Sequence, residues 1–304
     1  MRVVSLLPGA TEIVAALGAM ESLVGVTHEC DHPAVVASRV RVTGTAVDAT
    51  ATAASVDAQV KALTATGTPV FTLFEDRIRD LRPTHILTQA LCDVCAVVET
   101  DVRALAARLS PEPAVVTVSA TTIAGVLDDI VRVGAALDCG DEAAEFVAGA
   151  QTRMRTVHET LKAARAPRPR VAVIEWGDPI YAAGHWVPEM VKRAGGVDVL
   201  AAPGAHSVTV TADAVRAADP EVLIIAPCGY DLPRARAEAE RLLAQPDWAW
   251  ARSRRVFSID ANALTSRPGP RLIEGIELFA RLFNPSLFSP VEDHQCSSHR
   301  QSPS

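Results

Sequence analysis

The sequence of 304 residues has few aromatic side chains, no cluster of basic residues and no long apolar run. Aromatic residues make up only 4% of the chain, so Ala, Val and Leu must fill its core. Nucleic-acid binding is disfavoured, because a surface that follows phosphates needs clustered Lys and Arg, and the formal net charge here is −7. No apolar stretch approaches the roughly 18 residues of a membrane-spanning helix, which excludes a membrane span.

Several familiar catalytic templates are absent as well. The sequence contains no Walker-type phosphate loop, no G-x-G-x-x-G after the first apolar run and no G-x-S-x-G elbow. Whether the protein is an enzyme is therefore left open by its motifs, and a binding function is favoured.

The first residues bear on the compartment. An apolar run at residues 3–7 is followed at once by Pro8 and Gly9, and it is too short for the core of a signal peptide. No small-residue cleavage site follows it, so we expect a cytoplasmic protein. Six cysteines in a reducing compartment are not expected to form structural disulfides.

Short β-rich runs alternate with helical patterns in both halves of the chain, which is typical of βαβ units and a mainly parallel sheet. Strands are expected near residues 2–7, 23–26, 69–73, 84–88, 115–118, 171–175, 222–226 and 256–260. Helices are expected near residues 11–17, 77–81, 188–194, 234–243 and 271–282.

One long stretch without a strand candidate lies in the middle of the chain. Apolar residues recur at helical spacing from Ile123 to Val133, and Gly140 is expected to divide the stretch into two helices. We therefore expect an α/β fold with two Rossmann-like lobes joined by a long helical backbone. The predicted parts are an N-terminal lobe (1–120), the backbone and linker (121–166), a C-terminal lobe (167–285) and a disordered tail (286–304).

Several short motifs in this order resemble a known family. They are VSLLPGATE at residues 4–12, GHWVPE at 184–189, AGG at 194–196, DPEV at 219–222 and SRPGPR at 266–271. These motifs resemble the class III substrate-binding proteins of ABC importers, which carry cobalamin, haem or iron-siderophores, and the likeness covers about residues 1–285. It is strongest to the cobalamin-binding branch, in a cytosolic-type form without a signal peptide. The resemblance implies a cobalamin or other corrinoid ligand held between the lobes, and an ABC permease as a possible partner.

Candidate binding residues follow the predicted strands, because ligands of open α/β sheets bind outside the carboxyl ends of the strands. Trp186, next to His185, is an aromatic that could cover a flat macrocycle, and Glu175, in an acidic loop with Trp176, could bind a ligand amide or act as a general acid or base. Arg267 and Arg271 could face an anionic group or pair with Asp260. A cobalt corrinoid or haem can also take an axial imidazole, for which His28, His32, His185 and His206 are available. The candidate ligand-binding residues are Pro8, Gly9, Ala10, Thr11, His28, Glu175, Trp176, His185, Trp186, Arg267 and Arg271.

Four cysteines fall after predicted strands. Cys92 and Cys95 have the C-x-x-C spacing that lets two thiolates meet one soft metal, and Cys30 and Cys228 could complete a four-sulfur site. Such a site would hold zinc or an iron–sulfur cluster. The other interpretation is that these are small buried thiols, which are common in cores.

Two functions follow from these patterns. The first is a cobalamin- or corrinoid-binding protein of the ABC-transporter substrate-binding type. The second is a cytosolic metalloprotein or redox enzyme that uses a zinc or iron–sulfur site made by the four cysteines.

Overall fold

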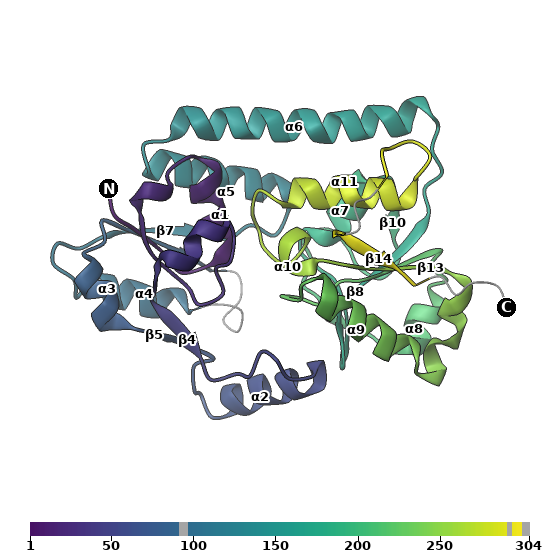
Figure 1. The fold of residues 1–304 in the computed structure, drawn as a ribbon, viewed down its shortest axis with the longest axis horizontal. Helices are drawn as coiled ribbons and strands as arrows, with labels where there is room; N and C mark the ends of the chain where they lie inside the picture. The colour runs from purple at the N-terminus through teal and green to yellow at the C-terminus, as the bar shows by residue number, and fades with distance from the viewer. Residues whose placement is uncertain (91–96, 291–293, 300–304) are drawn as a thin grey trace. The chain divides into compact units, whose positions relative to one another are not determined.

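The computed structural model describes residues 1–90, 97–290 and 294–299. The chain divides into two compact units (Figure 1). The first unit contains Met1–Ala120, Ala124–Gly149 and Pro268–Pro270, and the second contains Thr121–Ile123, Ala150–Arg267 and Arg271–Ser304. Each unit therefore includes a short piece of chain that is distant in sequence from the rest of that unit.

The first unit is built on a five-stranded parallel sheet with the order β3-β2-β1-β6-β7. Its strands are β1 (Val3–Ser5), β2 (Leu23–Val26), β3 (Val40–Arg41), β6 (His85–Gln89) and β7 (Ala114–Val118). An antiparallel pair, β4 (Thr43–Thr45) and β5 (Phe71–Leu73), stands apart from this sheet. The helices of this part are α1 (Pro8–Ala16), η1 (Met20–Ser22), η2 (Ala34–Ser38), α2 (Ala53–Ala65), α3 (Glu75–Leu81), α4 (Glu99–Ala106) and α5 (Ile123–Ala136).

The core of the first unit lies where two helices cover the sheet. Val4 and Ile86 of neighbouring strands pack with Ile78 of α3 and Leu105 of α4, and all four are fully buried. Burial of these apolar side chains is the main stabilising contribution, at about 1.5–3 kcal/mol for each. Because β1 is fixed in this way, the turn after it has a defined position.

The second unit contains a seven-stranded sheet with the path β11-β9-β8-β12-β13-β14, and β10 also pairs with β8. Strands β8, β10, β12 and β13 are parallel, whereas β9, β11 and β14 pair in the antiparallel sense. The strands are β8 (Arg170–Gly177), β9 (Ile180–Ala182), β10 (Val197–Asp198), β11 (Val208–Thr209), β12 (Val222–Ile225), β13 (Arg255–Ile259) and β14 (Cys296–Ser298). The helices are α7 (Val187–Arg193), α8 (Ala212–Ala217), α9 (Leu232–Leu243), η3 (Pro246–Ser253), α10 (Ala261–Leu264) and α11 (Leu272–Phe283).

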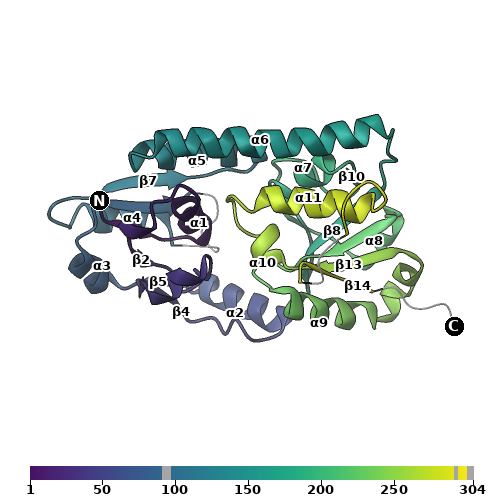
Figure 2. The same ribbon diagram turned by 45° about the horizontal axis from the view of Figure 1, so that its top comes forward.

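Helices cover both faces of this second sheet. Figures 1 and 2 both draw α9 on one side of β8 and β13, and α7 and α11 together on the other. Leu223 and Ile225 of β12 pack with Leu242 of α9 and with Trp248, which are all buried. This arrangement requires strands that are apolar on both faces, as the VLII run of β12 is. The mixed α/β architecture with mainly parallel sheets confirms the predicted fold class.

The strand-free stretch forms two helices, as predicted. Helix α5 ends at Ala136, Asp138 takes the left-handed conformation with φ 55°, and α6 (Gly140–Ala163) begins two residues later. The first ten residues of α6 belong to the first unit and the rest to the second. Within the described residues, no helix has the length and apolarity that crossing a membrane requires.

Two local expectations differ from the structure. Helix α1 starts at Pro8 rather than near Thr11, because proline is well suited to the first helical turn. The segment 286–304 was expected to lack structure, but Cys296–Ser298 forms β14 along β13, with Ile259 opposite Cys296. Backbone hydrogen bonds to an open sheet edge order these polar residues without needing an apolar core.

Candidate functional site

Polar and aromatic side chains gather at the carboxyl ends of β8 and β12 in the second unit. Glu175 and Trp176 lie at the end of β8, and Cys228 and Tyr230 follow β12. The backbone N–H of Cys228 donates to the carbonyl of Glu175 at 2.9 Å, which joins the two strand ends. The strand ends therefore form one polar edge, as expected for the binding side of a parallel sheet.

Glu175 lies at an irregularity in the sheet. The register between β8 and β9 shifts between Ile174 and Trp176, and such a bulge re-aims the side chain of the extra residue. The Glu175 carboxylate accepts hydrogen bonds from the Ser207 hydroxyl and the Gly184 N–H. Burial raises the pKa of Glu175 despite both hydrogen bonds, so the carboxyl takes up a proton more readily than an exposed glutamate does.

An aromatic pair stands beside this carboxyl. The rings of Trp176 and Tyr230 meet edge to face, with centroids 5.6 Å apart and planes at 67°. The Arg234 guanidinium lies 3.8 Å from the Tyr230 ring centroid, a cation–π contact that fixes the phenol ring. Trp176 is half-buried and donates its indole N–H to the Asp178 carbonyl at 3.2 Å. Tyr230 is itself buried, so Trp176 is the member of the pair that offers an aromatic surface at the strand ends.

Two segments far apart in the sequence close against each other next to Glu175. The His185 N–H donates to the Ala205 carbonyl at 2.6 Å, and the Gly204 N–H donates to the His185 carbonyl at 2.8 Å. Gly184 donates its N–H to the Ser207 hydroxyl oxygen at 3.2 Å. We call residues 183–186 and 204–207 the paired loops. They bring the imidazoles of His185 and His206 together, with His185 Nε2 3.3 Å from His206 Nδ1.

Trp186 has a different environment from Trp176. Its side chain is buried, and its indole N–H donates to the Thr265 carbonyl at 2.7 Å. Its ring also lies under His185, with centroids 5.7 Å apart. The structure thus places Trp186 as a support for His185, and its role in ligand binding stays a prediction.

In the first unit, the predicted residues 8–11 form the first turn of α1. Gly9, Ala10 and Thr11 are buried, and a Cβ atom on Gly9 would lie 2.7 Å from the Pro268 carbonyl oxygen. Pro268–Pro270 belongs to the same unit and covers this turn. The turn needs a residue without a side chain at position 9, because the two backbones approach so closely.

His28 and Cys30 lie in the turn after β2. The His28 ring nitrogen Nδ1 is 2.8 Å from the Thr43 hydroxyl, and burial, together with Arg41, lowers the pKa of His28. The Cys30 sulfur is buried and lies 3.1 Å from the Thr11 hydroxyl. In this environment Cys30 has the contacts of a core thiol.

The four predicted metal ligands fall in different parts of the chain. Cys30 belongs to the first unit and the exposed Cys228 to the second, while Cys92 and Cys95 lie outside the described residues. No group of three or more His, Cys, Asp or Glu side chains among the described residues could hold a metal ion. The four-cysteine site stays a prediction.

The two predicted arginines lie on either side of Pro268–Pro270. Arg267 is buried, with 7% of its surface exposed, and Arg271 is half-buried as the N-terminal boundary residue of α11. Both belong to the second unit. Their proposed contact with an anionic ligand group stays a prediction.

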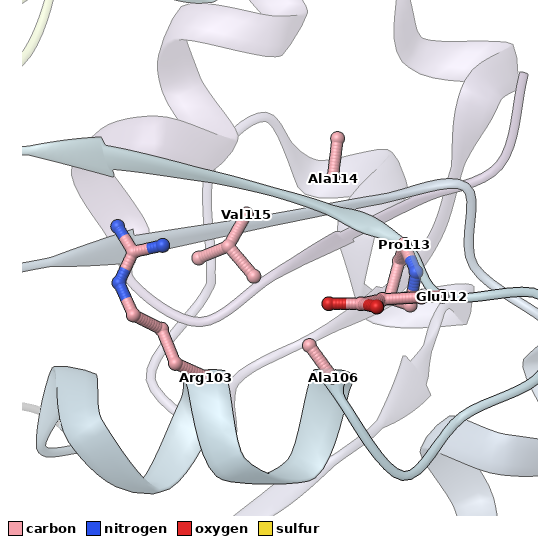
Figure 3. A pocket seen from close by; sticks show the side chains of 6 residues that line it. All are labelled: Arg103, Ala106, Glu112, Pro113, Ala114 and Val115. Carbon is pink, nitrogen blue, oxygen red and sulfur yellow. The ribbon is translucent and has the colours of Figure 1, made fainter.

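Two open cavities lie away from the strand ends just described. One has a volume of 570 Å³ and lies between α4 and the start of β7, where Arg103 and Glu112 are among the lining side chains (Figure 3). The other has a volume of 660 Å³ and lies between α9 and β14. Neither is lined by a predicted ligand-binding residue, so neither marks the candidate site.

Ser207, Gly184 and Tyr230 are site residues outside the set of predicted ligand-binding residues. Ser207 stands 32 positions after Glu175 and reaches it only because β11 pairs with β9 beside β8. No local sequence motif predicts the contact between Ser207 and Glu175. For Tyr230 a signal existed, since it follows β12 by a few residues and is one of only two tyrosines in the chain.

Comparison with known proteins gives a consistent picture. A family model described as "Periplasmic binding protein" matches residues 3–263. No curated protein matches the sequence.

Solved structures with similar folds cover nearly the whole chain. A periplasmic heme binding protein from Pseudomonas aeruginosa is 22% identical, covers 99% of both chains and has a TM-score of 0.73. An ABC transporter substrate-binding protein from Listeria monocytogenes EGD-e is 17% identical, with 93% of this chain and 98% of that chain covered and a TM-score of 0.66. The periplasmic vitamin B12 binding protein of Vibrio cholerae is 19% identical, with 94% and 97% covered and a TM-score of 0.64. At these identities the likeness establishes the fold.

Proposed function

Because the chain belongs to the periplasmic binding protein family, we propose that it binds cobalamin or a closely related corrinoid at the carboxyl ends of β8 and β12. Delivery of that ligand to an ABC permease is part of the same proposal. Solved structures of the same fold include binders of vitamin B12 and of heme, so the choice between these macrocycles has to come from the site itself.

The observation that carries the proposal is the pairing of an aromatic surface with a buried carboxyl. Trp176, set against Tyr230, offers a face on which a flat macrocycle can stack. Glu175 beside it has a raised pKa and can exchange hydrogen bonds with neutral amides. The rim of a corrin carries amide side chains, which a carboxyl can bond in either protonation state, whereas haem carries two carboxylates, which can bond only to the protonated form of Glu175 and are repelled by the ionised form. The edge therefore favours a corrinoid over haem.

A titration followed by visible spectroscopy tests this function. We expect added cobalamin to shift its corrin bands on binding, and Trp176→Ala to weaken the affinity about tenfold, the equivalent of about 1.4 kcal/mol. Trp176→Phe keeps an aromatic face and should retain most of the affinity. Haem, titrated in parallel, should bind more weakly than cobalamin, and Glu175→Gln should reduce that difference.

The matched control is Glu240→Gln, which removes an exposed carboxylate of α9 that pairs with Arg236. This variant should leave both affinities unchanged. Unshifted corrin bands at saturating cobalamin would contradict the proposal, and so would equal affinities for Trp176→Ala and the unaltered protein.

A second candidate function is the metalloprotein with a four-cysteine site. It is favoured by the position of Cys228, whose backbone is bonded to that of Glu175 at the same edge. Stoichiometric zinc, or iron with sulfide, in freshly purified protein would support it, and its loss in Cys92→Ser would link the metal to the predicted ligands. Protein free of these elements, with cobalamin binding unchanged in Cys92→Ser, would rule it out. The cytoplasmic location stays a prediction that cell fractionation can test.

A further inference from the structure

The imidazoles of His185 and His206 have the separation of two ligands on one metal ion. Their nitrogens His185 Nε2 and His206 Nδ1 are 3.3 Å apart. Zinc binds histidine nitrogen at about 2.0–2.1 Å in tetrahedral geometry, which places two such nitrogens about 3.3–3.4 Å from each other. We propose that this pair chelates a divalent transition-metal ion such as Zn²⁺, a site that goes beyond the corrinoid binding proposed above.

The backbone holds the first of the two imidazoles in place. His185 takes a left-handed conformation, with φ 53°, which is rare for a residue with a side chain and recurs at functional sites. Its N–H and carbonyl are both bonded to the facing segment, and its ring lies against the buried Trp186. A ligand that is oriented before the metal arrives loses little conformational freedom on binding.

The second imidazole is open to solvent. His206 is exposed, and its ring stands at 89° to that of His185, with centroids 5.2 Å apart. Because His206 is exposed, its ring is free to turn from this hydrogen-bonded arrangement so that its Nδ1 and His185 Nε2 face one metal ion. A metal ion can therefore enter from solvent without any opening of the core.

Proton positions are compatible with this site. In the hydrogen-bonded pair, one of the two facing nitrogens carries a proton, and chelation requires both to be bare. Each neutral ring can keep its single proton on the other nitrogen, Nδ1 of His185 and Nε2 of His206.

The pair cannot be the axial ligand set of a macrocycle. Haem and corrinoids fill four positions around the metal in a plane, and the two remaining positions lie on opposite faces. Two nitrogens 3.3 Å apart on one side suit a metal with adjacent free positions instead. Imidazole binds Zn²⁺, Ni²⁺ and Cu²⁺ well, and two further positions on a tetrahedral ion would hold water.

The test is a Zn²⁺ titration by calorimetry in a Cys92→Ser/Cys95→Ser background, which removes the strongest competing ligand pair. We expect one Zn²⁺ equivalent that weakens at least tenfold in His206→Ala. The matched control is His158→Ala, an exposed histidine of α6, which should leave that equivalent unchanged. Co²⁺ in place of Zn²⁺ should give the intense visible bands of a tetrahedral ion. These bands should disappear in His206→Ala and persist in His158→Ala.

His206→Ala changes an exposed residue, and circular dichroism will establish that the variant folds. Equal Zn²⁺ binding in His206→Ala and the unaltered background, or no Zn²⁺ equivalent in either, would overturn the proposal. A cobalamin titration of the same proteins distinguishes the corrinoid proposal from the Zn²⁺ proposal. Corrinoid binding can fail while the Zn²⁺ equivalent persists, and the Zn²⁺ equivalent can be missing while cobalamin still binds.

Discussion

Replacing Gly184 with alanine is expected to lower the free energy of unfolding by about 3 kcal/mol, because no space exists for the added methyl group. A Cβ atom at this position would lie 2.6 Å from the carbonyl carbon of His206 and 2.7 Å from the Ala205 oxygen, and it would also meet the Ser207 nitrogen. All three are backbone atoms, which cannot turn aside as a flexible side chain can. The paired loops must therefore separate, and the hydrogen bond from Gly184 N–H to the Ser207 hydroxyl is lost.

Urea denaturation of Gly184→Ala measures this effect. The matched control is Gly149→Ala, in the middle of α6, where an added Cβ meets no atom within 4 Å. That variant should gain about 0.5–1 kcal/mol, because alanine favours the helix more than glycine does. A Gly184→Ala protein as stable as the unaltered one would mean that the paired loops do not pack as closely as described. The loss of Zn²⁺ binding in the same variant would connect the loop contact to the histidine pair.

The stability of the second unit is expected to fall as pH rises from about 4 to 7, because of Asp198. Its Oδ1 accepts from the Leu200 and Ala201 N–H groups, both at 2.9 Å, and its Oδ2 is buried with no hydrogen-bond partner among the described residues. Burial raises the pKa of this carboxyl from 3.8 to about 6. The folded state thus keeps a proton that the unfolded chain gives up at lower pH.

The sign of the effect follows from this difference. Below pH 3.8 both states are protonated and Asp198 adds no pH dependence. Between pH 3.8 and about 6 only the unfolded state ionises, so unfolding becomes more favourable as pH rises. A pKa difference of about two units corresponds to about 3 kcal/mol, which is lost in full above the folded pKa.

Asp198→Asn removes this titration. Relative to the unaltered protein, we expect the variant to gain about 3 kcal/mol of stability between pH 4 and pH 7, measured by urea denaturation at several pH values. Asn keeps a carbonyl oxygen for the two N–H groups, so the turn itself is preserved. Asp213→Asn, at a residue with an exposed side chain, is the control and should leave the pH profile unchanged. Parallel profiles for Asp198→Asn and the unaltered protein would contradict the assignment.

The sequence predicts the secondary structure of this chain better than it predicts its contacts. The apolar runs at Leu23–Val26 and Val222–Ile225 became strands β2 and β12, since a continuous apolar run suits a strand buried on both faces. The helical stretch after Thr122 and its division at Gly140 were equally visible, because they depend on spacing within one segment. The short strands β10, β11 and β14 carried no such signal, and only pairing with a neighbouring strand makes them strands.

The candidate site likewise combines residues that the sequence predicts with contacts that it does not. Glu175 and Trp176 could be predicted, because the carboxyl end of a strand is a position that a sequence pattern reveals. The contact of Ser207 with Glu175 and the approach of His206 to His185 depend on how two loops fold against each other. Trp186 shows the opposite case, an aromatic in a recognisable motif whose indole N–H is bonded inside the core.

Pro268–Pro270 has a consequence for the order in which the protein forms during synthesis. The N-terminal turn of α1 is covered by a tripeptide that leaves the ribosome about 120 residues after the rest of its unit. At about 5–20 residues per second, this delay amounts to roughly 6–24 s. Throughout that interval the helix start at Gly9 lacks the tripeptide that covers it in the finished protein. The half of the protein that is made first is thus among the last to be finished.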